Sequence, residues 1–300
     1  MAKRLLVVVG PTAIGKTGVA IQLANYYKCD ILSSDSRQFY KEMKIGTAVP
    51  SQEELSAATH HFIQHRSIHE ATYSVGDYEA DAIQLLHAIY KENDTAILVG
   101  GSGLYLDAVT KGLDYFPDVT NDIKEEVAFL LKHKGKEYIR ELLKEKDPAY
   151  SQQVDLYNTQ RVLRALEVTL SSGKPYSSFV TGRSKKREFD PIFIGLTASR
   201  EIVYRRINER VDTMIKEGLV AEAFELLPYR NLNALNTVGY KEIFKYLQNE
   251  WDLPLAISEI KKNTRRFAKR QGTWFRKNER IKWFDYALDT KEIITYIDTL

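Results

Sequence analysis

The sequence contains a single cysteine, Cys29, among 300 residues. One cysteine excludes an intrachain disulfide framework and any zinc site built from cysteines alone. Long hydrophobic runs are also missing, because no stretch approaches the roughly 18 apolar residues that a membrane-spanning helix needs. A short apolar run follows two basic residues near the N-terminus, but a glycine motif begins directly after it, so we interpret it as a strand and not as a signal peptide. These absences predict a cytoplasmic protein without a membrane partner.

A large excess of one charge is missing too, since 43 Lys and Arg residues face 40 Asp and Glu residues. The distribution is more informative than the sum. Between Lys261 and Lys282 there are ten basic residues and one acid, Glu279, and a second basic cluster, GRSKKRE, spans 182–188. Such clusters can follow the backbone of a polyanion, although an exposed helix face is the ordinary interpretation of a charge run. Charge alone therefore leaves nucleic-acid binding open.

Strand and helix patterns alternate in the first hundred residues, which predicts an α/β fold with a parallel sheet. Buried-strand runs occupy 4–10, 29–35, 95–101 and 190–200, and helical patterns occupy 16–27 and 74–92. The segment 116–189 lacks buried-strand runs and is charged and helix-prone. We therefore expect a core formed by 1–115 and 190–300, interrupted by a helical insertion domain at 116–189.

The segment Gly10–Thr17 reads GPTAIGKT and matches the phosphate-binding pattern G-x-x-x-x-G-K-[ST]. It follows an apolar strand and precedes a helix, which is the context that the motif requires. Backbone N–H groups and the positive helix N-terminus would surround an anion, Lys16 adds a charge, and the Thr17 hydroxyl can bind Mg²⁺. The motif predicts a phosphate site but does not say which phosphate compound occupies it.

Asp35 follows the short strand ILSS and should lie near the phosphate loop, because the carboxyl ends of parallel strands share one crevice. From the residues alone it could be a metal ligand, the N-cap of a helix formed by SRQFYKEM, or a general base. A nucleotide hydrolase would also need an acidic residue at the end of a buried strand to hold its metal. We find no strand of that type with an ATPase-like neighbourhood.

Three weaker patterns accompany these motifs. Gly100, Gly101 and Gly103 surround Ser102 in a second strand–glycine–helix turn. The histidines at 61, 65 and 69 could share a helical face with zinc-ligand spacing, although packing or surface positions are the preferred interpretation because no HExxH motif accompanies them. Basic pairs recur every four residues over 261–270 and predict a basic stripe on a helix. Its other face carries Ile260, Thr264, Phe267, Gln271 and Trp274, which predicts core packing.

Together these stretches resemble the bacterial tRNA dimethylallyltransferases, also called tRNA isopentenyltransferases. The resemblance is carried by GPTAIGKT, SSDSRQFYKEMKIGTAVP, HHFI, YSVGDY, LVGGSGLY, TQRVLRALE, TASRE…RINER, TVGYKE and TRRFAKRQGTWFR. It covers almost the whole chain. It implies a P-loop-kinase-like core with a helical insertion that embraces the anticodon stem-loop of tRNA, and a Mg²⁺ requirement. We also expect a monomer. The implied reaction moves a dimethylallyl group from dimethylallyl diphosphate to N6 of the adenosine 3′ to the anticodon, position 37, in tRNAs that read codons beginning with U.

The resemblance also implies roles for individual residues. Asp35 matches the general base, Thr12 the residue that orders the donor, and Arg210 an arginine that contacts the diphosphate beside Lys16. The expected diphosphate site comprises Gly10, Pro11, Thr12, Ala13, Ile14, Gly15, Lys16, Thr17 and Arg210, with Thr17 as the metal ligand. Gln38 is expected to read an adenine edge. The expected tRNA contacts are Asp35, Ser36, Arg37, Gln38, Ser102, Lys124, Gln160, Arg161, Val162, Leu163, Arg164, Asn236, Thr237, Val238, Gly239, Tyr240 and Lys241.

Two positions depart from the family pattern, which usually has Thr at Ser102 and commonly Gln at Asn236. Both changes keep a polar group and so affect contact details more than the reaction. The zinc-finger extension of eukaryotic relatives is not expected in a chain with one cysteine. Without the resemblance, two alternatives remain: a small-molecule or nucleoside kinase in which Asp35 activates a hydroxyl, and an ATP-driven nucleic-acid-binding protein. The first leaves the basic stripe unexplained, and the second lacks an acidic strand end.

Overall fold

The structure, a computed structural model, describes residues 3–182 and 184–300. The chain divides into two compact units, here called the core unit, Met1–Thr110 with Lys186–Leu300, and the insertion unit, Lys111–Lys185. Position 183 of the predicted basic cluster 182–188 lies outside the described residues, as do positions 1 and 2. No helix in the described ranges is long and apolar enough to span a membrane.

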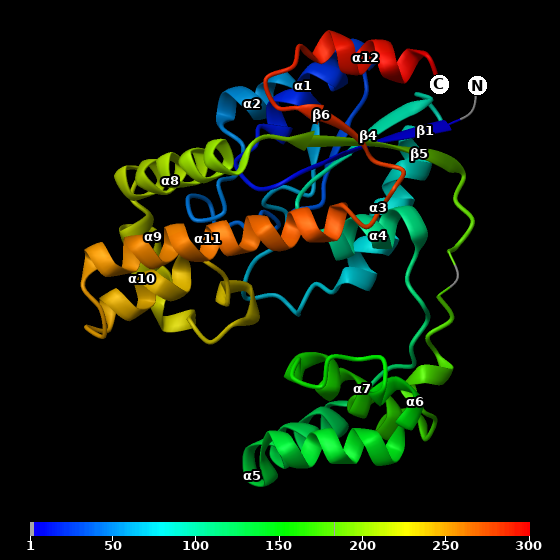
Figure 1. The fold of residues 1–300 in the computed structure, drawn as a ribbon, viewed down its shortest axis with the longest axis vertical. Helices are drawn as coiled ribbons and strands as arrows, with labels where there is room; N and C mark the ends of the chain where they lie inside the picture. The colour runs from blue at the N-terminus through cyan, green and yellow to red at the C-terminus, as the bar shows by residue number, and fades with distance from the viewer. Residues whose placement is uncertain (1–2, 183) are drawn as a thin grey trace. The chain divides into compact units, whose positions relative to one another are not determined.

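The core unit is built on a sheet of six strands in the order β3-β2-β4-β1-β5-β6. Every neighbouring pair is parallel, as the α/β pattern predicts. Figure 1 shows β1 in the middle of the sheet and the helices on its two faces. The strands are β1 Lys3–Val9, β2 Ile31–Ser33, β3 His60–His61, β4 Thr95–Val99, β5 Phe189–Thr197 and β6 Lys282–Asp285.

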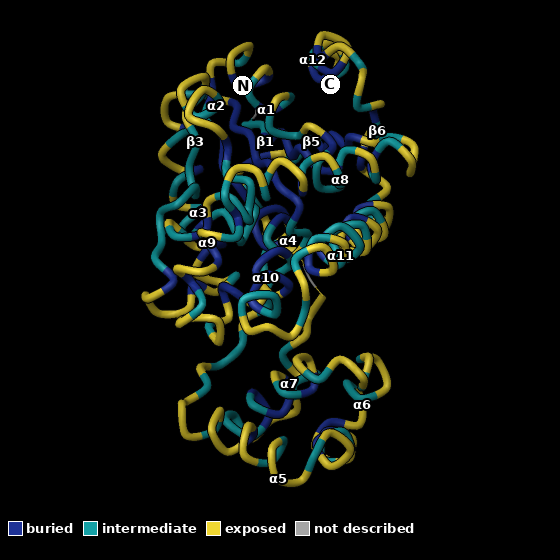
Figure 2. The backbone as a smooth tube through the Cα atoms, turned by 90° about the vertical axis from the view of Figure 1, so that its left-hand side faces the viewer, coloured by how far each residue is buried: buried dark blue, intermediate teal, exposed yellow. Residues whose placement is uncertain are grey.

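Alternation along β1 divides the hydrophobic core into two layers, because successive side chains point to opposite faces of a sheet. Leu5, Val7 and Val9 pack against α3, Val75–Ile89, and α4, Gly103–Lys111. Leu6 and Val8 pack on the other face against α1, Lys16–Tyr27, α8, Arg200–Lys216, and α12, Thr290–Asp298. Since both faces are covered, positions 5–9 of β1 form an uninterrupted apolar run, and Figure 2 shows the strand as mostly buried.

A third hydrophobic cluster lies where the C-terminal helices pack together. It joins α9 and α10 to the N-terminal half of α11 and includes Leu219, Tyr240, Ile243 and Ile260. Met43 from the loop after β2 also belongs to it, so this cluster fixes a loop of the sheet to the C-terminal helices. The remaining core-unit helices are α2 Gln52–Ala57, α9 Leu219–Leu226, α10 Tyr240–Leu247 and α11 Leu253–Phe275.

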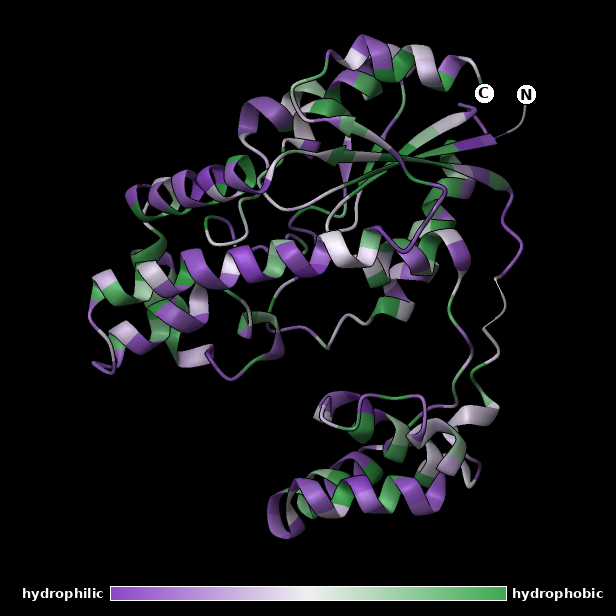
Figure 3. Ribbon diagram, viewed as in Figure 1, coloured by the Kyte–Doolittle hydropathy of each residue, from purple (hydrophilic) through white to green (hydrophobic). Residues whose placement is uncertain are grey.

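The insertion unit contains helices around its own small core, formed by residues such as Val127, Ile139, Leu143 and Leu166. Gly135 has a φ of 83° and interrupts α5. A left-handed conformation of this kind is open to glycine at little cost. Figure 3 shows apolar stripes on these otherwise polar helices, as expected for a small helical unit. The elements are α5 Asn121–Lys146, α6 Pro148–Ser151, α7 Thr159–Ser172 and the 3₁₀ turn Tyr176–Ser178.

Local sequence patterns predict several elements closely. Helix α1 has the predicted bounds, 16–27, and the expected cap of α3 is present, because the Ser74 hydroxyl accepts from the Asp77 N–H and the Asp77 carboxylate accepts from the Ser74 N–H. The alternative in which His61, His65 and His69 share a helical face is wrong, since 60–61 form an edge strand and 62–69 are irregular, with an isolated bridge between Arg66 and Tyr40. In the described ranges no group of three or more His, Cys, Asp or Glu side chains could hold a metal.

Candidate active site

The loop Gly10–Thr17 connects the carboxyl end of β1 to the first turn of α1. Gly15 has a φ of 109° and occupies the N-cap position of α1, where the left-handed conformation requires glycine. Gly10 is close-packed, because a Cβ atom there would lie 2.7 Å from the carbonyl oxygen of Leu196. The two motif glycines thus let the chain turn tightly and bring the N-terminus of α1 to the end of the sheet, which is a favourable position for an anion.

The Lys16 ammonium folds back over this loop. Its Nζ donates to the carbonyl oxygens of Gly10, at 3.1 Å, and Pro11, at 2.8 Å. Burial of the ammonium lowers the pKa of Lys16 to about 8, while the nearby Asp35 carboxylate acts to raise it and Arg210 to lower it further. The ammonium is therefore held above the loop and is poorly compensated, which favours the binding of a polyanion beside it.

Two arginines one turn apart on α8 face the loop. Arg206 donates from Nε to the carbonyl oxygen of Ala13 at 2.7 Å, and Arg210 donates from a terminal nitrogen to the Thr12 hydroxyl at 3.4 Å. Burial lowers the pKa of Arg210 from its ordinary value, and the carboxylates of Asp35 and Glu54 oppose this shift. Residues four apart on a helix share a face, so α8 supplies two positive charges to the same anion site.

Asp35 follows β2 and is oriented by its own turn. Its Oδ1 accepts from the Arg37 N–H at 3.1 Å, and its N–H donates to the Ser33 hydroxyl at 3.3 Å. Ser34 donates from its backbone N–H to the Val99 carbonyl at the end of β4 at 2.8 Å. The segment after Asp35 forms turns and not a helix, so the interpretation of Asp35 as the N-cap of a helix is wrong.

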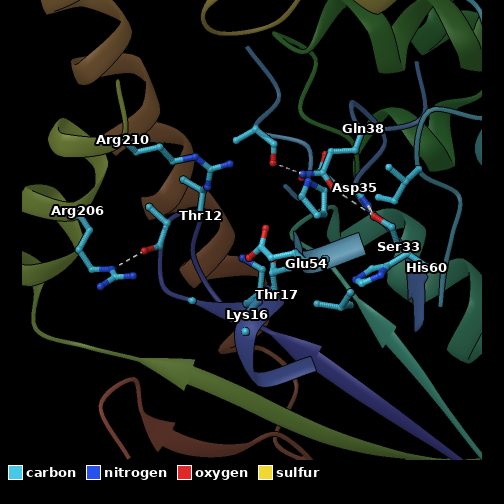
Figure 4. A pocket seen from close by; sticks show the side chains of 18 of the residues that line it. Thr12, Lys16, Thr17, Ser33, Asp35, Gln38, Glu54, His60, Arg206 and Arg210 are labelled. Carbon is cyan, nitrogen blue, oxygen red and sulfur yellow. Dashed lines mark hydrogen bonds between the residues drawn. The ribbon is translucent and has the colours of Figure 1, made fainter. Parts of the chain in front are cut away.

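A cavity of about 360 Å³, here called the first cavity, opens over the phosphate loop. Figure 4 shows Arg206 and Arg210 at one side of it, Asp35 and Gln38 at the other, and Lys16 and Thr17 below. Most of its lining is polar or charged, as an anion site requires. Its lining includes Thr12, Ala13, Gly15, Lys16, Thr17, Ser33, Asp35, Gln38, Glu54, His60, Arg206, Glu209 and Arg210.

A larger cavity of about 540 Å³, here called the second cavity, adjoins the first. Thr12, Asp35 and Arg210 line both cavities, so the two meet at these side chains. The second cavity has a more apolar wall that draws on the second glycine turn, α8 and α11. Its apolar and aromatic lining includes Leu104, Tyr105, Ile207, Val211, Met214, Val238, Ile260, Phe267 and Trp274.

The structure brings the two glycine turns and the end of β2 together, as the parallel-sheet argument predicts. The Ser102 hydroxyl accepts from the Ser36 N–H at 3.3 Å, and both serines line the second cavity. Arg37 also lines that cavity, with its guanidinium donating to the carbonyl oxygens of Asn233 and Ala234.

Gln38 differs from its neighbours because it lines the first cavity and does not appear in the lining of the second. Its Nε2 donates to the carbonyl oxygens of Thr47, at 3.2 Å, and Ala48, at 2.9 Å. This side chain therefore holds the loop around Thr47 in place. To read an adenine edge, Gln38 would have to exchange these two hydrogen bonds for bonds to the base.

The segment 236–241 contributes to the second cavity with all but one of its residues, Tyr240. The Tyr240 ring is fully buried beneath Gly46, where a Cβ atom would lie 2.6 Å from the ring. Its hydroxyl donates at 2.7 Å to the Glu222 carboxylate, which also accepts the N–H groups of Ile45 and Gly46. Tyr240 therefore packs under the loop that carries Thr47.

The other predicted tRNA contacts belong to the insertion unit. Lys124 lies on α5, and 160–164 lie on the first turns of α7. Gln160, Arg161 and Arg164 are exposed, whereas Val162 is fully buried in the core of this unit. The predicted segment thus presents its polar face to solvent and uses Val162 for packing.

The basic stripe of α11 divides into two parts. Lys261 forms an ion pair with Asp212 at 2.5 Å, Lys262 pairs with Glu259 at 2.6 Å, and Arg265 donates to the side chain of Asn208. The remaining cations of the stripe, Arg266, Lys269 and Arg270, are exposed. The exposed part lies toward the C-terminal half of α11 and is the part that can bind phosphates.

The predicted core face of α11 is partly wrong. Ile260 and Gln271 are buried, but Phe267 and Trp274 are each 40% exposed and line the second cavity. Helical periodicity correctly places these residues on one face. At Ile260 the face packs in the hydrophobic core, and toward Phe267 and Trp274 it lines the second cavity. The two aromatic rings are therefore only partly covered by protein.

Sequence reasoning missed several residues of the site, among them Arg206, Glu54, His60 and Gln271. The signal for Arg206 was available, because it lies four residues before Arg210 in the motif RINER. His60 places Nδ1 2.8 Å from the Ala58 carbonyl oxygen, and its buried Nε2 has no hydrogen-bond partner among the described residues. Figure 4 shows the His60 ring at the wall of the first cavity.

A parallel sheet with a phosphate loop after its central strand defines an α/β protein of the P-loop class. A charged cavity and a more apolar cavity adjoin beside this loop. Comparison with known proteins gives a more specific result, because the family described as IPP transferase matches residues 38–278. The chain belongs to this family, which confirms the predicted fold class and family.

Relatives and solved structures agree with this assignment. The chain is 55% identical over 301 aligned residues to the tRNA dimethylallyltransferase of Flavobacterium johnsoniae, covering 98% of this chain and 97% of the relative. A tRNA isopentenylpyrophosphate transferase from Bacillus halodurans is 34% identical, with a TM-score of 0.73 and coverage of 99% and 96%. A eukaryotic dimethylallyltransferase acting on tRNA has a TM-score of 0.83 at 24% identity, with coverage of 99% and 80%, and so shares the fold.

Proposed function

We propose that this protein transfers a dimethylallyl group from dimethylallyl diphosphate to N6 of the adenosine 3′ to the anticodon, position 37, in tRNAs that read codons beginning with U. The observation that carries this proposal is the meeting of a charged cavity and a more apolar cavity at Thr12, Asp35 and Arg210. A prenyl transfer needs these two environments, because the donor has a strongly anionic end and the acceptor is a planar base. The family membership supports the same reaction.

The first cavity fits the diphosphate of the donor. Lys16, Arg206 and Arg210 supply three positive charges, and the N-terminus of α1 supplies a favourable dipole. The hard oxygen donors that Mg²⁺ prefers also line this cavity, as the Thr17 hydroxyl and the Asp35 and Glu54 carboxylates. Thr17 would hold the ion, which when bound neutralises charge on the leaving diphosphate.

At the junction, the reaction balances without a further reactant. The exocyclic N6 attacks C1 of the allylic donor, a C–N bond forms, and the C1–O bond to diphosphate breaks. The N6 amine is a poor nucleophile because its lone pair is delocalised into the ring, and it must lose a proton as it reacts. The Asp35 carboxylate would accept that proton, while Thr12 orients the donor and Arg210 stabilises the negative charge on the leaving oxygen.

The second cavity fits the acceptor base. A base in an anticodon loop has to leave its stack to reach an enclosed carboxylate, and an opening lined by Phe267, Trp274 and Tyr105 offers flat surfaces to such a base. The exposed cations of α11, and Lys124, Gln160, Arg161 and Arg164 of the insertion unit, would bind the tRNA backbone. We further propose that the protein acts as a monomer, and tRNA as substrate supports a cytoplasmic location.

One assay tests the function directly. Unmodified tRNA is incubated with Mg²⁺ and dimethylallyl diphosphate labelled in its prenyl group, and in parallel with ATP labelled in its γ-phosphate. We expect label on tRNA from the first donor alone, and nuclease digestion should locate it on the adenosine at position 37. A tRNA carrying guanosine at that position is the matched control and should remain unlabelled. Phosphorylation of an acceptor by ATP without prenylated tRNA would overturn the proposal.

A further inference from the structure

Gln271 is a buried amide whose two ends are both engaged by loops that line the cavities. It lies on the inner face of α11 and is 5% exposed. Its Oε1 accepts from the Thr12 N–H at 2.8 Å, and its Nε2 donates to the Gly101 carbonyl oxygen at 3.0 Å. Because an unpaired amide is costly to bury, this side chain has a strong preference for the one orientation that satisfies both bonds.

The bond to Thr12 has a direct consequence for the phosphate loop. The Thr12 N–H is committed to Gln271, so this amide is turned toward α11 and is not a donor to the phosphates. The Thr12 side chain then lies at the junction of the cavities, with its hydroxyl 3.4 Å from a terminal nitrogen of Arg210. The position of that hydroxyl is therefore influenced by a residue of α11.

The bond to Gly101 fixes the other end of the amide. A Cβ atom at Gly101 would overlap Nε2 of Gln271, so the glycine is needed for the approach. The next residue, Ser102, accepts from the Ser36 N–H beside Asp35. One side chain thus joins the loop that carries Thr12 to the turn that contacts the Asp35 segment.

We propose that Gln271 is a positioning residue that holds the Thr12 hydroxyl in register with the Asp35 carboxylate. Resting on the function proposed above, this inference concerns the distance between the residue that orders the donor and the base that accepts the proton. A displacement of about 1 Å in such an arrangement can lower a rate by roughly 10²-fold. Gln271 also lines the second cavity, and the inferred effect acts through the backbone of Thr12.

A double-mutant cycle tests this role. Gln271→Met keeps the length of the side chain and removes both hydrogen bonds, while Thr12→Ala removes the hydroxyl and leaves the backbone N–H. We expect Gln271→Met to lower the single-turnover rate of prenyl transfer about 10- to 100-fold in the natural background. In the Thr12→Ala background the same change should lower the rate less than about twofold, because the hydroxyl that Gln271 positions is already missing. Affinity for tRNA should stay within about threefold.

Tyr90→Phe is the matched control, since it removes a buried side-chain bond to the Arg4 carbonyl oxygen at a position outside both cavity linings. It should reduce thermal stability and leave the transfer rate unchanged. If Gln271→Met lowers the rate equally with and without the Thr12 hydroxyl, the positioning role is wrong. If the natural enzyme does not prenylate tRNA at all, the proposed function fails first, which separates the two outcomes.

An activity-independent measurement covers the case in which Gln271→Met folds poorly. Protein labelled with ¹⁵N-threonine reports the exchange rate of the Thr12 amide proton in the intact chain. Gln271→Glu keeps an oxygen that can accept from Thr12 and loses the donor to Gly101, so we expect Thr12 protection to persist in this variant and to be lost in Gln271→Met. A Thr12 amide that exchanges as fast in the natural protein as in an exposed loop would overturn the inference.

Discussion

The two cavities differ in the way the chain builds them. The first has its floor in one continuous segment, Gly10–Thr17, and its positive charges come from this segment and two arginines of α8. The second combines turns after three strands with residues of α8 and α11 that are far apart in the sequence. Anion binding can be specified by a short loop because backbone N–H groups and a helix N-terminus supply much of the interaction with the anion. A cavity for a base needs an apolar wall. The residues of such a wall come from distant parts of the sequence and meet only in the tertiary fold.

The difference extends to charge. The first cavity places Lys16, Arg206 and Arg210 beside the carboxylates of Asp35, Glu54 and Glu209, whereas the second has mainly apolar and aromatic walls. Asp35 is the carboxylate common to both linings in the described residues. In the proposed function, the chemistry therefore takes place at the junction and binding on its two sides. Substitutions at the junction, in the first cavity and on the surface near the second cavity test this division.

The largest effect is expected at the junction. Asp35→Asn keeps the acceptor for the Arg37 N–H but removes the basic carboxylate, and should lower the single-turnover rate by roughly 10²–10⁴-fold. Affinity for tRNA should change little, because the anionic backbone is bound elsewhere. Rapid-quench measurement of label transfer, beside a tRNA filter-binding titration, separates the two quantities.

Glu54→Gln is the matched control for this variant, since it neutralises a carboxylate that lines the first cavity alone. Glutamine also preserves the cap on α2, where Glu54 accepts from the Ser51 N–H. We expect a change in KM for the donor with less than a tenfold change in the transfer rate. Equal rate losses in the two variants would show that the junction is not distinct from the first cavity.

The next effect concerns the first cavity and its dependence on pH. Because the pKa of Lys16 is lowered to about 8, its ammonium is present below pH 8 and is lost as the pH rises through that value. Affinity for inorganic diphosphate should therefore be steady from pH 6.5 to 7.5 and fall by up to about tenfold per unit above pH 8, since the charged form is the one that binds. Titration calorimetry across this range measures it.

Lys16→Arg supplies the control, because a guanidinium keeps its proton throughout. This variant experiences the same titration of the ligand, so the difference between the two curves belongs to Lys16. For the folding stability of the free protein, the effect of raising the pH is opposite to its effect on diphosphate affinity. The folded pKa lies below the unfolded value of 10.5, the unfolded chain binds more protons between them, and stability should rise with pH across that interval. If the affinities of the natural protein and of Lys16→Arg changed with pH in the same way, the pH dependence of binding would not come from Lys16.

Local patterns were sufficient for the phosphate loop of the first cavity because its determinants are close in the sequence. The phosphate loop and α1 could be predicted from the run that begins at Gly10, and Asp35 from the rule that parallel strands end at one edge. Arg206 was missed although it precedes Arg210 by one helical turn, a spacing that could have identified it. The two short strands β3 and β6 have no long apolar run, because they lie at the sheet edges.

The second cavity was harder to predict for a physical reason. Periodicity on α11 shows which residues share a face but not what that face meets, so Phe267 and Trp274 could not be distinguished from the buried Ile260. Gln271 bonds to Thr12 across 259 positions, and a pattern within one helix contains no information about that partner. The motif resemblance placed both stretches at the site without giving their geometry.

The smallest effect is expected on the surface near the second cavity, and it compares two pairs of cations on α11. Replacing exposed Lys269 and Arg270 with alanine should weaken tRNA binding several-fold at moderate salt. Each lost phosphate contact should also reduce the slope of log K against log salt by about 0.7 to 0.9. Lys261 and Lys262 carry the same charge but are already paired with Asp212 and Glu259, so their replacement should change the slope less. Filter binding of tRNA from 50 to 300 mM salt gives both slopes. Equal changes for the two pairs would mean that the ion pairs open when tRNA binds, and the whole stripe would then belong to the interface.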